Sequence, residues 1–222
     1  MKKEDIKIIE LTFVNAFLIK INEGFILIDT GVSMYWEKLE SELIAVGSLP
    51  DKIKLVIITH GDFDHTGNCA KLQEKYKCKI AMHKDDAFMA ENGVFPKRKV
   101  KTFTAKIFMY IRKLKRRGKF TFDKFKPDVY LTEGQDLKEY GLNAKIIHIP
   151  GHTKGSIGII TDDGILFAGD IFTNRKKPDT ATYIENSGEL KNSMNRLKTM
   201  NIKTIYPGHG KPFEMEQIVN KL

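Results

Sequence analysis

Histidines and carboxylates in this chain stand directly after short apolar runs that have the length and composition of buried strands. The runs are residues 54–59, 145–149, 165–168 and 203–206, and they lead into His60, His152, Asp170 and His209. Glycines stand beside these residues, and four of the six histidines of the chain lie in such places. We therefore expect four strand ends to converge and to bring these side chains together, rather than scatter them over unrelated loops.

The rest of the pattern predicts one domain over residues 1–222, because a chain of this length suits a single domain. The other predicted strands are residues 6–9, 13–20, 25–29, 78–82, 129–131 and 156–161. Helical spacing predicts helices over residues 34–46, 67–76, 85–91, 102–114, 187–200 and 214–221. The helix over 102–114 belongs to a basic helical insertion at about residues 95–126.

Seven side chains at or near these strand ends have the chemistry of a divalent-metal site: His60, Asp62, Asp64, His65, His152, Asp170 and His209. Imidazole and carboxylate together suit zinc, iron or manganese. Carboxylates this near in sequence would repel one another without a cation among them. Seven donors exceed the needs of one tetrahedral ion. They fit two ions, and two ions about 3.5–4 Å apart can hold and activate a hydroxide.

Five short motifs, in this order, resemble the metallo-β-lactamase superfamily and extend from residue 28 to residue 210. They are Ile-Asp-Thr-Gly at 28–31, Thr-His-Gly-Asp-Phe-Asp-His-Thr-Gly at 59–67, Pro-Gly-His-Thr at 150–153, Phe-Ala-Gly-Asp at 167–170 and Pro-Gly-His-Gly at 207–210. The resemblance implies an α/β fold, a four-layer αββα sandwich of two facing mixed sheets covered by helices. It also implies a metal centre at one edge. The second and third motifs look most like the branch containing glyoxalase II and the acyl-lactone hydrolases.

Carried over by position, the resemblance implies a role for each donor. The implied first site is His60, Asp62 and His152, the implied second site is Asp64, His65 and His209, and Asp170 is the implied bridge. Asp64 would also act catalytically, by orienting the nucleophile and passing its proton to the leaving group. Asp29 fits an acid that orients a ligand histidine, although it can also be interpreted as the acid that starts a turn. His83, His148 and Ser156 are interpreted as structural.

Asp62 departs from the family pattern, His-x-His-x-Asp-His, because it stands where the second histidine is expected. A carboxylate there adds negative charge and shifts the preference toward iron or manganese. We expect two divalent ions, zinc before iron or manganese. Asp62 can alternatively lie outside the ligand set, which would leave the first ion weakly held.

Together these implications favour a metal-dependent hydrolase. A hydroxide held by two metals would cleave a small ester, thioester or lactone, with a phosphoester left open. Asp62 suggests an alternative, a di-iron redox protein of the flavodiiron type without its own flavin domain. A binding module with a vestigial site is a third, less favoured hypothesis.

Charge is unevenly distributed along the chain. Residues 97–126 hold thirteen lysines and arginines against one acid, whereas the other residues carry a small excess of acids. As a lid, this segment would attract an anionic small-molecule substrate. Peripheral membrane contact and a homodimer are left open, and nucleic acid is disfavoured. With no export signal and no apolar run long enough to span a membrane, the expected location is the cytoplasm, where Cys69 and Cys78 stay reduced.

Overall fold

The computed structural model describes residues 3–94, 99–100 and 122–221. The helix predicted over residues 102–114, and with it most of the basic insertion, lies outside the described residues. Short 3₁₀ turns lie at Lys3–Asp5, Ser33–Tyr35, Lys138–Tyr140, Met215–Gln217 and Val219–Lys221.

The N-terminal half builds one mixed sheet in the strand order β1-β2-β3-β4-β5-β7. Its strands are β1 (Ile6–Leu11), β2 (Val14–Ile21), β3 (Gly24–Ile28), β4 (Ile53–Ile57), β5 (Ile80–His83) and β7 (Val129–Leu131). The first three form an antiparallel meander, and β3, β4, β5 and β7 run parallel. The helices of this half are α1 (Trp36–Ala45), α2 (Phe63–Thr66), α3 (Cys69–Tyr76) and α4 (Lys84–Asn92). Leu39 and Leu43 of α1 and Leu72 of α3 pack in one core cluster with the outer face of the sheet.

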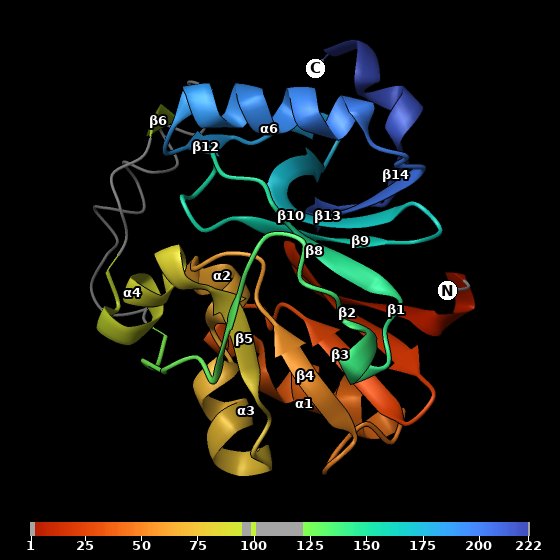
Figure 1. The fold of residues 1–222 in the computed structure, drawn as a ribbon. Coiled ribbons are helices and arrows are strands. Elements are labelled where there is room, and N and C mark those ends of the chain that lie inside the picture. The colour runs from red at the N-terminus through yellow and green to blue at the C-terminus, as the bar shows by residue number, and fades with distance from the viewer. Residues whose placement is uncertain (1–2, 95–98, 101–121, 222) are drawn as a thin grey trace.

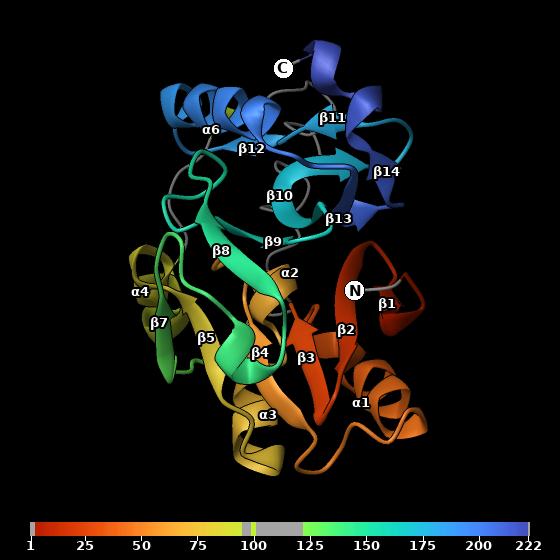
Figure 2. The same cartoon turned by 45° about the vertical axis from the view of Figure 1, so that its right-hand side comes forward.

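The C-terminal half builds the second sheet in the order β14-β13-β10-β9-β8, with β11 paired to β10. Its strands are β8 (Ala144–His148), β9 (Ile157–Thr161), β10 (Ile165–Asn174), β11 (Asp179–Thr180), β13 (Thr204–Gly210) and β14 (Phe213–Glu214). Helix α6 (Ser187–Thr199) covers its outer face, with Leu190, Met194 and Leu197 buried (Figures 1 and 2). A separate short ribbon pairs β6 (Lys99–Val100) with β12 (Tyr183–Ile184).

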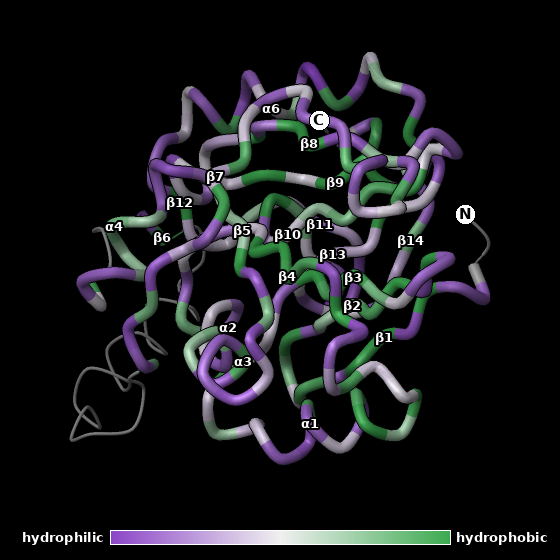
Figure 3. Tube along the Cα trace, turned by 60° about the horizontal axis from the view of Figure 1, so that its bottom comes forward, coloured by the Kyte–Doolittle hydropathy of each residue, from purple (hydrophilic) through white to green (hydrophobic). Residues whose placement is uncertain are grey.

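The two sheets face each other across an apolar layer, so that the order from bottom to top is helix, sheet, sheet, helix (Figure 2). Phe17 of β2 packs on Phe167 of β10 and Tyr206 of β13, with ring centroids 5.2 and 5.8 Å apart. Strand β2 is buried on both faces, because alternate residues pack toward the helices and toward the facing sheet. Figure 3 shows the resulting hydrophobic interior along the strands. This is the expected four-layer αββα sandwich.

Two predicted strand ends were wrong. Strand β10 continues past Ala168 to Asn174, and β13 continues past Tyr206 to Gly210. Their parallel pairing shifts register on either side of Gly169, which has a φ of +51°. Asp170 and His209 are therefore presented from within irregular strands, not from loops that follow them.

The helix predicted over residues 214–221 was also wrong. Phe213 and Glu214 form β14 against β13, and two 3₁₀ turns follow. The Glu214 side chain accepts from Thr204 Oγ1 of the neighbouring strand, so the start of the expected helix is held in the sheet.

Among the described residues, none of the helices is both long enough and apolar enough to cross a membrane. Cys69 and Cys78 are free, buried thiols, as expected from a chain without a disulfide scaffold.

We predict that Phe17→Ala lowers the free energy of unfolding by about 3–5 kcal/mol, because it empties the layer between the sheets. Urea denaturation of the variant measures this loss. Phe88→Ala is the matched control: Phe88 is 64% exposed, and its truncation should change stability by less than about 0.5 kcal/mol. Similar losses for both variants would contradict this account of the core.

Candidate metal centre

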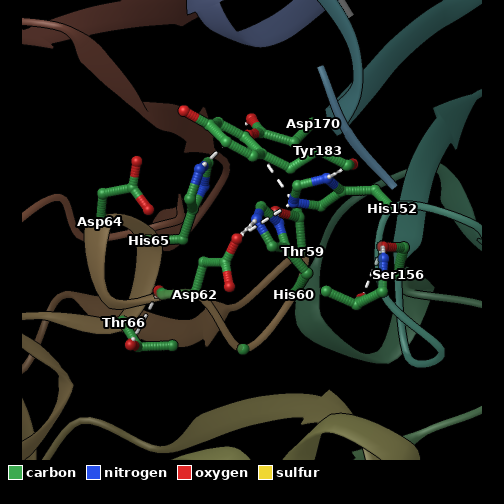
Figure 4. Close-up of polar contacts among 12 residues, drawn as sticks. Thr59, His60, Asp62, Asp64, His65, Thr66, His152, Ser156, Asp170 and Tyr183 are labelled. Atoms are coloured by element: carbon green, nitrogen blue, oxygen red, sulfur yellow. Dashed lines mark hydrogen bonds and ion pairs between the residues drawn. The ribbon is translucent and has the colours of Figure 1, made fainter. Parts of the chain in front are cut away.

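The structure brings all seven predicted donors to one edge of the sandwich, where the two sheets meet. His60 and Asp62 lie in the loop after β4, and Asp64 and His65 lie in the short helix α2 that follows. His152 lies in the loop after β8, and Asp170 and His209 come from β10 and β13. Figure 4 shows six of these side chains directed toward one another. Both halves of the chain thus contribute to the same cluster.

The donor atoms form two groups. In each of two triads, His60 with His152 and Asp170, and Asp64 with His65 and His209, one ligand atom per residue lies within 4.8 Å of the other two. Asp62 joins the first group, with Oδ2 3.1 Å from His152 Nε2 and 3.5 Å from His60 Nε2. This position agrees with Asp62 being a ligand rather than lying outside the set.

Asp170 lies between the two groups and contacts both. Its Oδ2 is 3.1 Å from His209 Nε2 and 3.8 Å from His152 Nε2, while its Oδ1 is 3.3 Å from His65 Nε2. The bulged path of β10 around Gly169 turns this side chain into the centre. Asp170 therefore lies between the histidines of both groups, and its role as a bridge stays a prediction.

All four histidines present the same nitrogen to the centre, because each engages the protein through Nδ1. The partners are Thr59 Oγ1 at 3.0 Å for His60, Asp29 Oδ2 at 2.8 Å for His65, the Tyr183 carbonyl at 2.7 Å for His152 and the Phe13 carbonyl for His209. Carbonyl and carboxylate oxygens only accept, and the Thr59 hydroxyl donates to Asp29, so the proton belongs on Nδ1 of each ring. In the neutral imidazole, Nε2 then carries a lone pair directed at the centre.

These lone pairs meet carboxylate oxygens at 3.1–3.8 Å, which brings acceptors against acceptors. Such contacts are stable only with a proton or a cation between the atoms. Three buried atoms that could ligate a metal have no hydrogen-bond partner among the described residues: His60 Nε2, His65 Nε2 and Asp170 Oδ1. The set of imidazole nitrogens and carboxylates therefore fits divalent cations.

The charges of the centre shift the pKa values of its members in opposite directions. Burial alone would lower the pKa of His65, but the carboxylates of Asp29 and Asp170 outweigh it and raise that pKa well above its usual range. Burial would likewise raise the pKa of Asp170, yet His209 and His65 hold it well below its usual range. Burial and the neighbouring His65 lower the pKa of His60. The cluster therefore attracts positive charge, which protons or metal ions can supply.

Asp29 contacts a candidate ligand, as the sequence suggested. Its fully buried carboxylate lies 2.8 Å from His65 Nδ1 and accepts from the backbone N–H of Thr59 at 2.8 Å. The Thr59 hydroxyl donates to the same carboxylate and lies beside the His60 ring. One acid thus fixes a histidine of each group, directly for His65 and through Thr59 for His60.

Two contributors were missed from the sequence: Thr59, just described, and Asp86, a buried acid of α4 that bonds to both ligand loops. The signal for Asp86 was its place just after strand β5, at the same edge of the sheet. His83 and His148 stack with centroids 4.3 Å apart and lie outside the seven donors, although with Asp85 they form a third cluster of possible donor atoms. Ser156 lies just before β9, as expected.

Comparison with known proteins identifies the family to which this chain belongs. The family model described as "Metallo-beta-lactamase superfamily" matches residues 9–209. A probable metallo-hydrolase of Methanocaldococcus jannaschii is 33% identical over 205 residues, which cover 88% of this chain and 87% of that protein. Hydroxyacylglutathione hydrolase GloC of Haemophilus influenzae is 31% identical over 122 residues, covering 54% of this chain and only 50% of that protein. The acyl-coenzyme A thioesterase MBLAC2 of Bos taurus is 23% identical over 217 residues, covering 92% of this chain and 75% of that protein.

Among solved structures, the fold is similar to that of BJP-1, a subclass B3 metallo-β-lactamase of Bradyrhizobium japonicum. The TM-score is 0.70 at 21% sequence identity, and the match covers 92% of this chain and 75% of that one. Since the family model spans nearly the whole chain and a full-length relative is a third identical, this chain belongs to the metallo-β-lactamase superfamily.

Proposed function

We propose that this chain is a hydrolase whose seven donors hold two divalent ions, zinc before iron or manganese. It would cleave a small ester, thioester or lactone. The observation that carries the proposal is the set of four Nε2 lone pairs directed at the three carboxylates of one buried cluster. His60, Asp62 and His152 would hold the first ion, Asp64, His65 and His209 the second, and Asp170 both.

When bound, the ions would supply a water of lowered pKa and positive charge to polarise the carbonyl of the substrate. The side chains of the centre would orient the reacting groups and transfer the proton. The Asp64 side chain is 14% exposed, more than the buried His209, whose Nε2 lies 3.5 Å from Asp64 Oδ2. An oxygen of Asp64 can therefore accept a proton from the attacking water and deliver it to the leaving group. The buried histidines keep their Nδ1 protons and hold fixed orientations during this transfer.

The relatives support a thioester among the candidate substrates. GloC carries the name hydroxyacylglutathione hydrolase and MBLAC2 the name acyl-coenzyme A thioesterase, and both names describe acyl groups on a thiol carrier. An anionic substrate fits the thirteen basic residues of segment 97–126. A cytoplasmic location, a homodimer and membrane contact through that segment stay predictions.

The di-iron redox alternative rests on Asp62 alone. The position of Asp62 Oδ2, 3.1 Å from His152 Nε2 and 3.5 Å from His60 Nε2, would suit a ligand in a hydrolytic centre as well as in a redox centre. The relatives described above are named as hydrolases, which supports the hydrolytic proposal over the redox one.

We predict that two zinc ions bind per chain and stabilise the fold. With zinc at about 100 times the dissociation constant, each site should add about 2.7 kcal/mol to the free energy of unfolding. Metal analysis after dialysis, and urea denaturation of chelator-treated and reloaded protein, measure both effects. His209→Ala should lower the stoichiometry from two to one. Unfolding that is the same with and without metal would contradict a metal centre.

We further predict that Asp64→Asn lowers kcat for thioester or lactone hydrolysis by about 10²–10⁴-fold, because the amide cannot carry the proton. Steady-state rates on a panel of thioesters, lactones and phosphodiesters measure the loss at matched metal content. Glu91→Gln, which replaces an exposed acid outside the seven donors and outside the third cluster, is the control and should leave kcat within a factor of two. An Asp64→Asn enzyme that turns over every panel substrate at the normal rate would exclude this role.

A further inference from the structure

A second buried acid, Asp86, joins the two loops of the first group through hydrogen bonds to Gly61, Thr153 and Gly155 rather than to any of the seven donor side chains. It lies in the first turn of α4, directly after strand β5, and is 1% exposed. Its Oδ2 accepts from the backbone N–H of Gly61 at 2.8 Å and from Thr153 Oγ1 at 2.7 Å. Its Oδ1 accepts from the backbone N–H of Gly155 at 2.7 Å. All three donors are neutral, and all three bonds are short.

These contacts bracket the candidate ligands of the first site. Gly61 stands between His60 and Asp62, while Thr153 follows His152. One carboxylate therefore connects a loop of the first sheet to a loop of the second sheet, across sequence separations of 25 and 67 residues. Because the bonds come from the Gly61 backbone in one loop, and from the Thr153 hydroxyl and the Gly155 backbone in the other, the position of Asp86 bears on how far apart the two ligand loops lie.

The approach of Asp86 to the second loop is close. A Cβ on Gly155 would lie 2.6 Å from Cγ of Asp86, so only glycine permits this contact. The Thr153 hydroxyl that donates to Asp86 is in turn contacted by Ser156 Oγ at 2.7 Å, and Ser156 Oγ also accepts from the Thr153 backbone N–H at 3.0 Å. Since the Thr153 hydroxyl donates to Asp86, the Ser156 hydroxyl donates to Thr153, and Asp86 is the final acceptor of this chain of hydrogen bonds.

The second group has its own acid. Asp29 bonds to His65 Nδ1 and to Thr59. It affects the first group only indirectly, because the Thr59 hydroxyl that donates to Asp29 also contacts the His60 ring. Asp86 contacts the loops of the first group alone, since none of its three partners lies next to His65 or His209 in sequence. The two acids thus hold different parts of the centre.

We propose that Asp86 is a positioning residue that fixes the separation of the His60 and His152 loops and so determines the metal affinity of the first site selectively. The inference rests on the proposed two-metal centre. Loss of the carboxylate charge weakens three charge-assisted hydrogen bonds, and an amide placed there must turn one NH₂ group toward a backbone N–H donor. The histidine and aspartate of the Gly61 loop then no longer face His152 at the distance that one ion requires.

The test measures each site alone. His209→Ala disables the second site and leaves the first, and His60→Ala does the converse. In each background, Co²⁺ binding is followed by visible absorption and Zn²⁺ binding by competition with a chelator. We expect Asp86→Asn to weaken binding 10–100-fold with His209→Ala, as for other residues that orient metal ligands, and less than threefold with His60→Ala. Glu91→Gln, which removes the charge of an exposed acid near the other end of α4, is the matched control and should change neither affinity.

Three other results would overturn the inference. Equal weakening in both backgrounds would show general loosening, and a lowered melting temperature with unchanged affinities would show a purely structural acid. Absence of metal binding in both single-site backgrounds before Asp86 is changed would overturn the two-metal centre itself.

A milder variant keeps the test available if Asp86→Asn does not fold. Thr153→Val removes one of the three donors while keeping the side-chain shape, and it should weaken the first site by a smaller factor than Asp86→Asn. Thr153→Ser restores the hydroxyl and should restore the affinity. Equal affinities for the valine and serine variants would count against the role of Asp86.

Discussion

The constraint on which this structure depends is the need for positive charge among buried acceptors. Imidazole nitrogens and carboxylate oxygens from five segments of the chain converge, with nitrogen–oxygen pairs 3.1–3.8 Å apart. Bringing these atoms together removes their hydration, which costs free energy, and a cation among them compensates for that cost. The fixed Nδ1 contacts follow from the same need, because a histidine free to rotate would turn its lone pair away from the carboxylates.

The centre also lies where the two halves of the molecule are joined. His209 of the second sheet is held by the Phe13 carbonyl near the start of β2, and Asn15 of β2 donates to the carbonyls of Pro207 and Gly210 at 3.1 and 2.7 Å. Asp86 likewise links Gly61 of the His60 loop to Thr153 of the His152 loop. Metal binding at this centre would therefore be coupled to the docking of one sheet on the other, which the aromatic layer around Phe17 completes.

The convergence of the donors was predicted from local strand patterns, and the four layers were implied by the family resemblance that the five motifs carry. Apolar runs that end at His60 and His152 are short-range signals, and the five motifs are nearly contiguous strings. The paths of β10 and β13 could not be predicted, since their continuation depends on pairing between Thr173 and His209 across a bulge. Asp86 was missed for a similar reason: its partners are 25 to 69 residues away, and an acid in the first turn of a helix is ordinarily explained by the helix dipole.

Asp62 changes the charge of the centre in a way that bears on the substrate. With an aspartate instead of a histidine there, each group contains two histidines and one carboxylate, and Asp170 is shared between them. Two divalent ions would then face three carboxylates, leaving an excess of one positive charge, half of what a histidine at position 62 would leave. A smaller excess attracts an anionic substrate less strongly. If the substrate is anionic, as proposed above, the thirteen basic residues of segment 97–126 would supply the attraction that Asp62 removes from the centre.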